Sequence, residues 1–139
     1  MAGIRVYCDA DEPAVIALWE QCGLVVPWNV PALDIARKLA FQPELFFVSE
    51  ADGALTGSIM AGYEGHRGWI NYLAVAPALQ SGGLGRALMD FAEARLRALG
   101  CPKVNLQVRG TNERALGFYE RLGYTRDDAV SLGKRLDGK

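Results

Sequence analysis

The chain contains Gln80-Ser81-Gly82-Gly83-Leu84-Gly85-Arg86, a glycine-rich turn between an apolar run at 69–75 and a strongly helical run at 86–99. Glycines let the backbone approach a ligand without an intervening Cβ atom. The first N–H groups of a helix have no carbonyl partner within it, and the helix dipole favours negative charge beside them. This order of strand, turn and helix predicts an anion site, which we expect to hold the pyrophosphate of a nucleotide-like cofactor.

Spacing separates this turn from two other phosphate-binding loops. A P-loop requires Gly-Lys-Ser/Thr, whereas Gly85 is followed by Arg86 and Ala87. The dinucleotide fingerprint requires a third glycine three residues after the second, and Leu88 occupies that position when Gly83 and Gly85 are the first two. The turn therefore fits neither class.

Length, charge and cysteine content exclude several classes of protein. A chain of 139 residues suits one core, so we expect a single domain over 1–139. A net charge of −1 gives no field to attract nucleic acid, and no apolar run approaches the roughly 20 residues of a membrane span. Three dispersed cysteines and one histidine argue against disulfides and metal sites. Without a signal-peptide pattern in 1–11, we expect a cytoplasmic protein with no metal, nucleic-acid or membrane partner.

Hydrophobic periodicity predicts alternating strands and helices. In chain order we expect a strand at 4–7, helices within 9–23 and at 33–39, strands at 45–50, 54–63 and 69–75, a helix at 86–99, a strand at 104–108, a helix at 113–122, and a closing hairpin of 124–126 and 130–136. Asp52-Gly53 suits the positive φ angles of a tight hairpin turn. The order predicts an α/β fold with a mixed sheet and helices on both faces.

Two blocks of the sequence resemble characteristic motifs of the GNAT N-acetyltransferases. The first is Gln80-x-x-Gly83-x-Gly85, which follows a strand ending in Leu73-Ala74-Val75. The second is Asn112-Glu113-x-Ala115-x-x-Phe118-Tyr119-Glu120-x-Leu122-Gly123-Tyr124, at the separation usual in that family. Together they cover 69–124. Within the family the chain is similar to a bacterial YpeA-type subgroup, through stretches that include Pro27-Trp28-Asn29 and Tyr63-x-Gly65-His66-Arg67-Gly68.

The resemblance implies the GNAT acyl-CoA N-acyltransferase fold, a mostly antiparallel, splayed sheet flanked by helices, and transfer of an acetyl group from acetyl-CoA to a primary amine. Backbone groups of the turn would hold the pyrophosphate, at Gln80, Ser81, Gly82, Gly83, Leu84, Gly85 and Arg86. The pantetheine arm would lie along Leu73, Ala74 and Val75, with the N–H of Leu73 or its neighbour facing the thioester carbonyl. Asn112 matches a residue that often touches the cofactor, and an asparagine there is equally suited to capping a helix.

The resemblance also implies catalytic roles. Tyr119 matches the tyrosine that protonates the departing thiolate of CoA; the alternative is a core aromatic on an amphipathic helix. Many relatives carry a glutamate where this chain has 70–72, and Asn71 there would at most orient a water molecule. Glu64 and His66 are the nearest candidates in sequence for the general base; the alternatives are a solvated turn without catalytic function and direct attack assisted by water.

The acceptor pocket should be framed by the loop between the first two helices, because the family varies there. Trp28 and Asn29 are the candidate lining residues, with a packing anchor as the alternative for Trp28, and Asn71 is a further candidate for substrate binding. The acceptor would be a small-molecule or protein amine, and a homodimer is expected by analogy with such folds. A second hypothesis is a non-catalytic CoA-binding regulatory module on the same fold, and a third is a different acyl donor.

Overall fold

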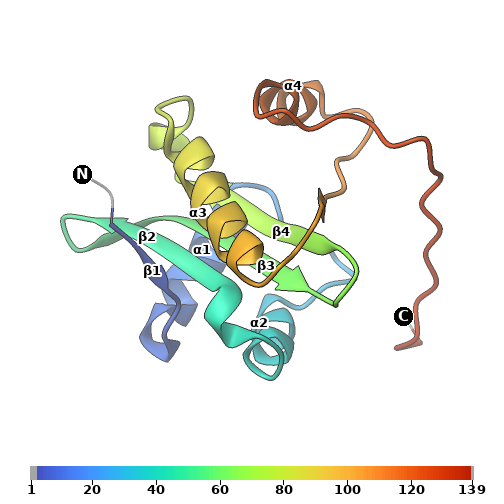
Figure 1. The fold of residues 1–139 in the computed structure, drawn as a ribbon. Helices are drawn as coiled ribbons and strands as arrows, with labels where there is room; N and C mark the ends of the chain where they lie inside the picture. Colours follow the sequence, from blue (N-terminus) through green and yellow to red (C-terminus); the bar gives the residue numbers. More distant parts are fainter. Residues whose placement is uncertain (1–2, 139) are drawn as a thin grey trace. The chain divides into compact units, whose positions relative to one another are not determined.

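Five strands form one sheet in chain order, β1 to β5 (Figure 1). They are β1 (Gly3–Val6), β2 (Phe46–Ala51), β3 (Ala54–Tyr63), β4 (Gly68–Val75) and β5 (Val104–Asn105). The first four pair antiparallel to their neighbours, whereas β5 runs parallel to β4. The expected mixed sheet is thus confirmed.

The computed structural model describes residues 3–138, which divide into two compact units after Leu106. The first unit holds the sheet and three α-helices, and the second holds one α-helix followed by extended chain. The single-domain prediction for 1–139 includes residues 1, 2 and 139, which lie outside the described residues, and it stays a prediction.

Helices of the first unit cover both faces of the sheet. On one face lie α1 (Glu12–Gln21) and α2 (Pro31–Leu39), whose Trp19 and Ile35 are fully buried in one cluster with Phe46 of β2. On the other face lies α3 (Leu84–Ala98), in front of the sheet in Figure 1, with buried side chains at Leu88, Met89, Ala92 and Leu96. Each large apolar side chain buried in this way contributes roughly 1.5–3 kcal/mol. Short 3-10 turns precede α1 (Asp9–Asp11), β2 (Pro43–Leu45) and the glycine-rich turn (Pro77–Leu79).

The turn between β2 and β3 forms as the sequence predicts. Asp52 has a φ angle of 54° and Gly53 one of 78°. Ala51 pairs directly with Ala54, so these two residues are the whole loop. Positive φ at both positions matches the right-handed twist of the strands that they join.

Two side chains form hydrogen bonds with the backbone of β3 beyond the point where its pairing with β2 ends. Pairing with β2 begins at Phe46 and Met60, so Ala61 and Tyr63 lie beyond it. The buried Nζ of Lys38 donates to the carbonyl oxygen of Ala61. The side-chain amide of Gln42 accepts from the N–H of Tyr63 at 2.8 Å and donates to its carbonyl oxygen at 2.7 Å. These contacts satisfy backbone groups that would otherwise lack a strand partner.

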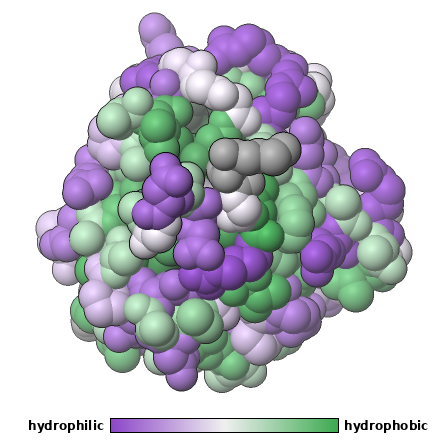
Figure 2. Space-filling model, turned by 90° about the vertical axis from the view of Figure 1, so that its left-hand side faces the viewer, coloured by the Kyte–Doolittle hydropathy of each residue, from purple (hydrophilic) through white to green (hydrophobic). Residues whose placement is uncertain are grey.

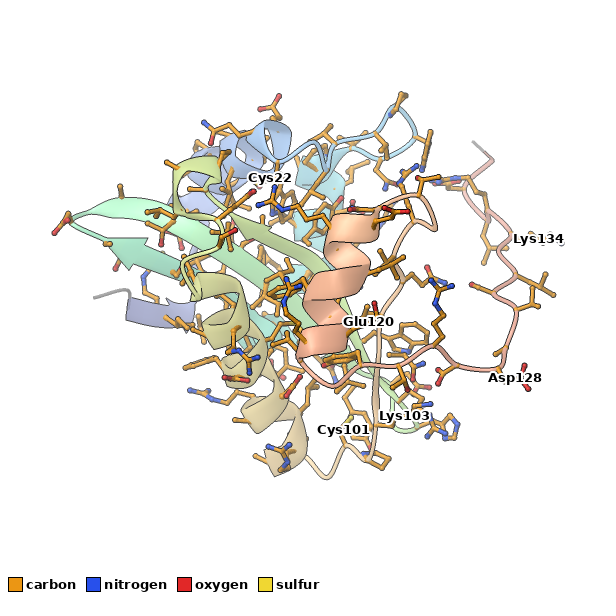
Figure 3. All side chains as sticks on the ribbon, turned by 90° about the horizontal axis from the view of Figure 1, so that it is seen from above. Cys22, Cys101, Lys103, Glu120, Asp128 and Lys134 are labelled. Atoms are coloured by element: carbon orange, nitrogen blue, oxygen red, sulfur yellow. The ribbon has the colours of Figure 1, made fainter. Side chains whose placement is uncertain are left out.

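The second unit contains α4 (Glu113–Arg121), which is followed by Gly123 at a φ angle of 94°, a left-handed conformation that often ends helices. Glu120, labelled in Figure 3, marks this helix. The predicted closing hairpin of 124–126 and 130–136 is wrong, because 124–138 contains no strand. Val130, Leu132 and Leu136 are about nine-tenths exposed. An isolated two-stranded hairpin without an apolar face to cover is marginal at best.

Two further observations bear on function. Among residues 3–138, no helix is long and apolar enough to cross a membrane. The face shown in Figure 2 mixes hydrophilic and hydrophobic residues, without a uniform surface of either kind.

Candidate functional site

The glycine-rich turn leads from β4 into the first turn of α3, so its last three residues are helical. Gly83 caps the helix with a φ angle of 91°, and its carbonyl accepts the helical hydrogen bond from the N–H of Ala87 at 3.0 Å. Ser81 also has a positive φ angle, 70°. Left-handed residues next to a helix start turn successive N–H groups inward, which is the geometry of an anion-binding concavity.

Side chains tie this turn to the end of β4. The carbonyl oxygen of Val75 accepts from Nε2 of Gln80 at 3.0 Å and from Sγ of Cys22 at 3.3 Å. Cys22 follows α1 and is labelled in Figure 3. The side chain of Gln80 thus has a structural contact beside the backbone role predicted from the sequence.

The sheet opens along β4. Its pairing with β5 is confined to Gly68 and Trp69. Within the described 3–138, no strand pairs with that edge over 70–75. The predicted splay is confirmed, although β5 has only two of the five residues predicted at 104–108. An open edge of this kind offers N–H and C=O groups to any extended ligand.

A bulge interrupts β4 within the open segment. Ser58 pairs with Ala74 and Met60 pairs with Asn71, so Ile59 lies opposite two residues, Tyr72 and Leu73. Tyr72 has a φ angle of 52°, a left-handed conformation that costs a non-glycine residue roughly 1–2 kcal/mol. Bulges of this type occur often beside active sites, where they re-aim backbone and side chains.

Tyr72 is held by contacts to three other elements. Its ring stacks on Trp19 of α1, with centroids 3.8 Å apart. Its hydroxyl donates to Oδ2 of Asp34 in α2 at 2.5 Å, and its carbonyl oxygen accepts from Oγ of Ser58 at 2.9 Å. Burial and the neighbouring carboxylate raise the pKa of Tyr72, so the hydroxyl stays a donor. Sequence reasoning missed this cluster, because a tyrosine inside an apolar strand gives no signal of a bulge.

The candidate bases lie in a turn at the other end of β4. The turn connects Tyr63 to Gly68, which pair with each other, whereas the bulge follows about four residues later, or roughly 13 Å along the strand. Oε1 of Glu64 accepts from the N–H of His66 at 2.8 Å and from the N–H of Arg67. These hydrogen bonds lower the pKa of Glu64. The structure does not bring Glu64 or His66 together with the bulge, and a catalytic role for either stays a prediction.

The candidate acceptor residues lie near the start of α2 and on β4. Trp28 is 47% exposed, in a turn closed by a hydrogen bond from the N–H of Asn29 to Val26. Asn71 is exposed and adjoins the bulge. Lining of an acceptor pocket by these three residues stays a prediction.

The second unit contains the remaining candidates. Oδ1 of Asn112 accepts from the N–H of Ala115 at 3.1 Å, so it caps α4, and its contact with a cofactor stays a prediction. The ring of Tyr119 makes edge-on contacts with Phe118 and Tyr124. Burial raises the pKa of Tyr119 to about 12. A phenol in this environment remains protonated and able to donate near neutral pH.

Cysteine, histidine and acidic side chains are the groups that could ligate a metal ion. Cys8, Cys22 and Cys101 are free thiols. In the part of the chain that the structure describes, no group of three or more histidine, cysteine, aspartate and glutamate side chains is placed to hold a metal ion.

Comparison with known proteins assigns the family. A family model described as the acetyltransferase (GNAT) family matches residues 13–124. The chain belongs to this family. An acetyltransferase of Yersinia enterocolitica is 50% identical over 133 residues, which are 96% of this chain and 94% of that protein. The resemblance inferred from the two sequence blocks is therefore confirmed.

Solved structures of GNAT enzymes share the fold. The Ard1 protein of Thermoplasma volcanium is similar with a TM-score of 0.77 and 27% identity, over 89% of this chain and 82% of that one. The ribosomal-protein-S18-alanine N-acetyltransferase of Escherichia coli gives a TM-score of 0.74 and 26% identity, over 88% and 77%. Membership of the family and these relatives make the chain an acetyl-transferring enzyme.

Proposed function

We propose that this protein transfers the acetyl group of acetyl-CoA to a primary amine. The observation that supports the proposal most directly is the open edge of β4 beyond Trp69, which runs through the bulge towards the glycine-rich turn. The pantetheine arm pairs with this edge as an additional strand would, along Leu73, Ala74 and Val75. The pyrophosphate lies at the N–H groups of the turn and the start of α3.

The reaction is direct attack on the thioester. The lone pair of a neutral amine forms a bond to the carbonyl carbon, and the N–H of Leu73 stabilises the negative charge that develops on the carbonyl oxygen. The carbon–sulfur bond then breaks. Tyr119 donates its proton to the leaving thiolate and regains one from solvent, giving an amide and free CoA. The raised pKa of Tyr119 supports this role, because the acid is fully protonated at the start.

The proton lost by the amine passes to water in this proposal. In this proposal Asn71 orients such a water molecule, and its exposure beside the bulge supports the role. The carboxylate of Glu64 is engaged by the backbone of its own turn, at the far end of β4. For this reason we propose water, and not Glu64 or His66, as the group that takes the proton from the amine.

An acceptor screen tests the proposal. Purified protein is mixed with acetyl-CoA and a panel of free amino acids, polyamines, aminoglycosides and short peptides, and both thiol release and acetylated product are measured. A peptide with N-terminal alanine belongs in the panel, since the Escherichia coli relative acts on the alanine of ribosomal protein S18. Acceptor-dependent thiol release with one acetyl group added per thiol is expected. Binding of acetyl-CoA without turnover for any amine class would contradict the proposal. A cytoplasmic location and a homodimer stay predictions.

A further inference from the structure

Tyr72 has an unusual backbone for its position. Among the described residues, four other than glycine have positive φ: Gln42, Asp52, Tyr72 and Ser81. Only Tyr72 of these lies within a strand. The other three lie in turns or loops, outside the strands and helices. A bulky aromatic residue adopts it only where the surroundings hold it there.

One buried hydroxyl connects the side chains that hold the bulge. Oγ of Ser58 accepts from Nε1 of Trp19 at 2.9 Å and donates to the carbonyl oxygen of Tyr72 at 2.9 Å. Ser58 and Trp19 are fully buried. Because the indole and the tyrosine ring also stack, Trp19 supports both the side chain and, through Ser58, the backbone of Tyr72.

The bond from Ser58 fixes the direction of a particular N–H group. The carbonyl of Tyr72 and the N–H of Leu73 belong to the same peptide unit, which is planar and trans. In a trans peptide the C=O and N–H point in opposite directions. A carbonyl held towards Ser58 therefore aims the N–H of Leu73 away from Ser58.

We propose that Tyr72 and Ser58 are positioning residues for acetyl transfer: together they lock the β4 bulge and aim the N–H of Leu73 at the thioester carbonyl of bound acetyl-CoA. The inference rests on the proposed function, in which that N–H stabilises the developing oxyanion. Neither side chain contacts the reacting atoms. The hydrogen bond from Tyr72 to Asp34 also holds the bulge in place. It joins the bulge to α2, the helix that follows the expected acceptor loop.

Two substitutions separate this role from a general effect on stability. Ser58→Ala removes the bond to the Tyr72 carbonyl together with the acceptor of the Trp19 indole. Tyr72→Phe removes the bond to Asp34 while keeping the ring that stacks on Trp19. The matched controls are Ser49→Ala, which removes a buried hydroxyl bonded to Thr56 at 2.9 Å, and Tyr63→Phe, whose hydroxyl bonds to Gly65 at the surface. Neither control residue has been assigned a part in binding or chemistry.

A positioning role for Ser58 and Tyr72 predicts a lower kcat with unchanged affinity for acetyl-CoA. Removing one hydrogen-bond donor to the oxyanion lowers kcat by about 100- to 1000-fold. Turning the N–H of Leu73 away from the thioester carbonyl should therefore lower kcat by at least about tenfold. We expect that loss in Ser58→Ala and a smaller one in Tyr72→Phe, with the Kd for acetyl-CoA from calorimetry unchanged within about twofold. Both controls should keep wild-type kcat.

A second readout does not depend on turnover. The amide ¹H–¹⁵N shift of Leu73 should differ between the complexes with acetyl-CoA and with CoA, since only the former has a thioester carbonyl. This difference should shrink in Ser58→Ala and Tyr72→Phe but not in the controls. Retention of both the shift difference and kcat by the two variants would overturn the inference. If wild-type protein acetylates no amine, the proposed function fails and the Leu73 shift alone decides the positioning role. If Ser58→Ala does not fold, Tyr72→Phe decides it.

Discussion

The guanidinium group of Arg5 donates two parallel hydrogen bonds to the carboxylate of Asp11, from Nη1 to Oδ2 at 2.8 Å and from Nη2 to Oδ1 at 2.9 Å. Asp11 is buried and also accepts from the N–H of Cys8 at 2.9 Å. Because Arg5 lies on β1 and Asp11 directly precedes α1, the pair fixes the connection between the first strand and the first helix. Two-point pairing of arginine with carboxylate is among the stronger polar contacts in proteins.

This pair predicts a loss of stability in acid. The hydrogen bonds from Arg5 lower the pKa of Asp11 from 3.8 to about 2, so the stabilisation is complete above pH 4 and disappears as the pH falls towards 2. The shift corresponds to about 2 kcal/mol. Urea unfolding of wild type and Asp11→Asn from pH 7 to pH 2 measures it. The difference in unfolding free energy between the two proteins should narrow below pH 4; a constant difference would show that the ion pair contributes nothing pH-dependent.

Gly57 should not tolerate a side chain. A Cβ atom there would lie 2.7 Å from Oγ of Ser49 and 2.8 Å from Cδ1 of Leu88, closer than real Cβ contacts. Gly57→Ala should therefore destabilise the protein by roughly 1–3 kcal/mol in chemical denaturation, as overpacking does. Gly62→Ala is the control, since its Cβ would make ordinary contacts at 3.6 Å and beyond. Equal stability of the two variants would contradict the close packing of α3 on β3.

Gly83→Glu should abolish binding of acetyl-CoA in calorimetry. The substitution places bulk and negative charge where we expect the pyrophosphate, at a residue with a φ angle of 91°. Gly100→Glu is a matched control, because Gly100 has a φ angle of 85° at the other end of α3 and equally open space around it. Both variants carry the same backbone penalty. Retained binding in Gly83→Glu, or equal loss in both, would remove the turn from the cofactor site.

Tyr119→Phe should lower kcat by about 10- to 100-fold with little change in the Kd for acetyl-CoA, because it removes only the proton donor. With a pKa of about 12, Tyr119 stays protonated up to about pH 11. Wild-type kcat should therefore show no decline between pH 8 and pH 10 from loss of this acid. Tyr63→Phe again serves as the control. Unchanged kcat in Tyr119→Phe would assign the tyrosine to packing against Phe118 and Tyr124.

Glu64→Gln and His66→Ala should leave the pH dependence of kcat/KM as it is in wild type. The turn that carries both residues lies roughly 13 Å along β4 from the bulge, and the carboxylate of Glu64 binds backbone N–H groups. Glu64→Gln keeps an Oε1 acceptor but loses its charge, which weakens the hydrogen bonds from the backbone, so amide hydrogen exchange of Arg67 should become faster. A shifted titration limb in either variant would restore that residue as the general base.

Local signals predicted much of the first unit. Asp52-Gly53 specified the β2–β3 turn through its φ angles. The glycine-rich turn predicted a helix at 86–99, and α3 begins two residues earlier, at Leu84 after Gly83. Such features depend on neighbours in sequence, so a pattern identifies them. The loop and α4 blocks also sufficed to assign the family.

Local sequence patterns did not predict the bulge in β4 or the structure of the C-terminal segment. Strict alternation would place Asn71 and Tyr72 on opposite faces of β4, yet Asn71 pairs with Met60 and Tyr72 stacks on Trp19, both on the α1 side. The extra residue is fixed by contacts from α1, α2 and β3, which are distant in sequence. For 130–136, alternation alone predicted a strand, but a strand also needs a partner.

The contacts of Lys38 and Gln42 with the end of β3 affect which edge of the sheet is open to association. The side-chain amide of Gln42 makes the same two hydrogen bonds to Tyr63 that a neighbouring strand would make. The ammonium group of Lys38 donates to the carbonyl oxygen of Ala61. A strand from another molecule would have to displace both to extend the sheet there, and the chain thereby opposes edge-to-edge aggregation at this end. Among the described residues, the side-chain contacts to the backbone of β4 over 70–75 include those of Ser58 at Tyr72 and of Cys22 and Gln80 at Val75, and no strand pairs with this edge over that range. The edge that we assign to acetyl-CoA thus stays open to an added strand, unlike the blocked end of β3.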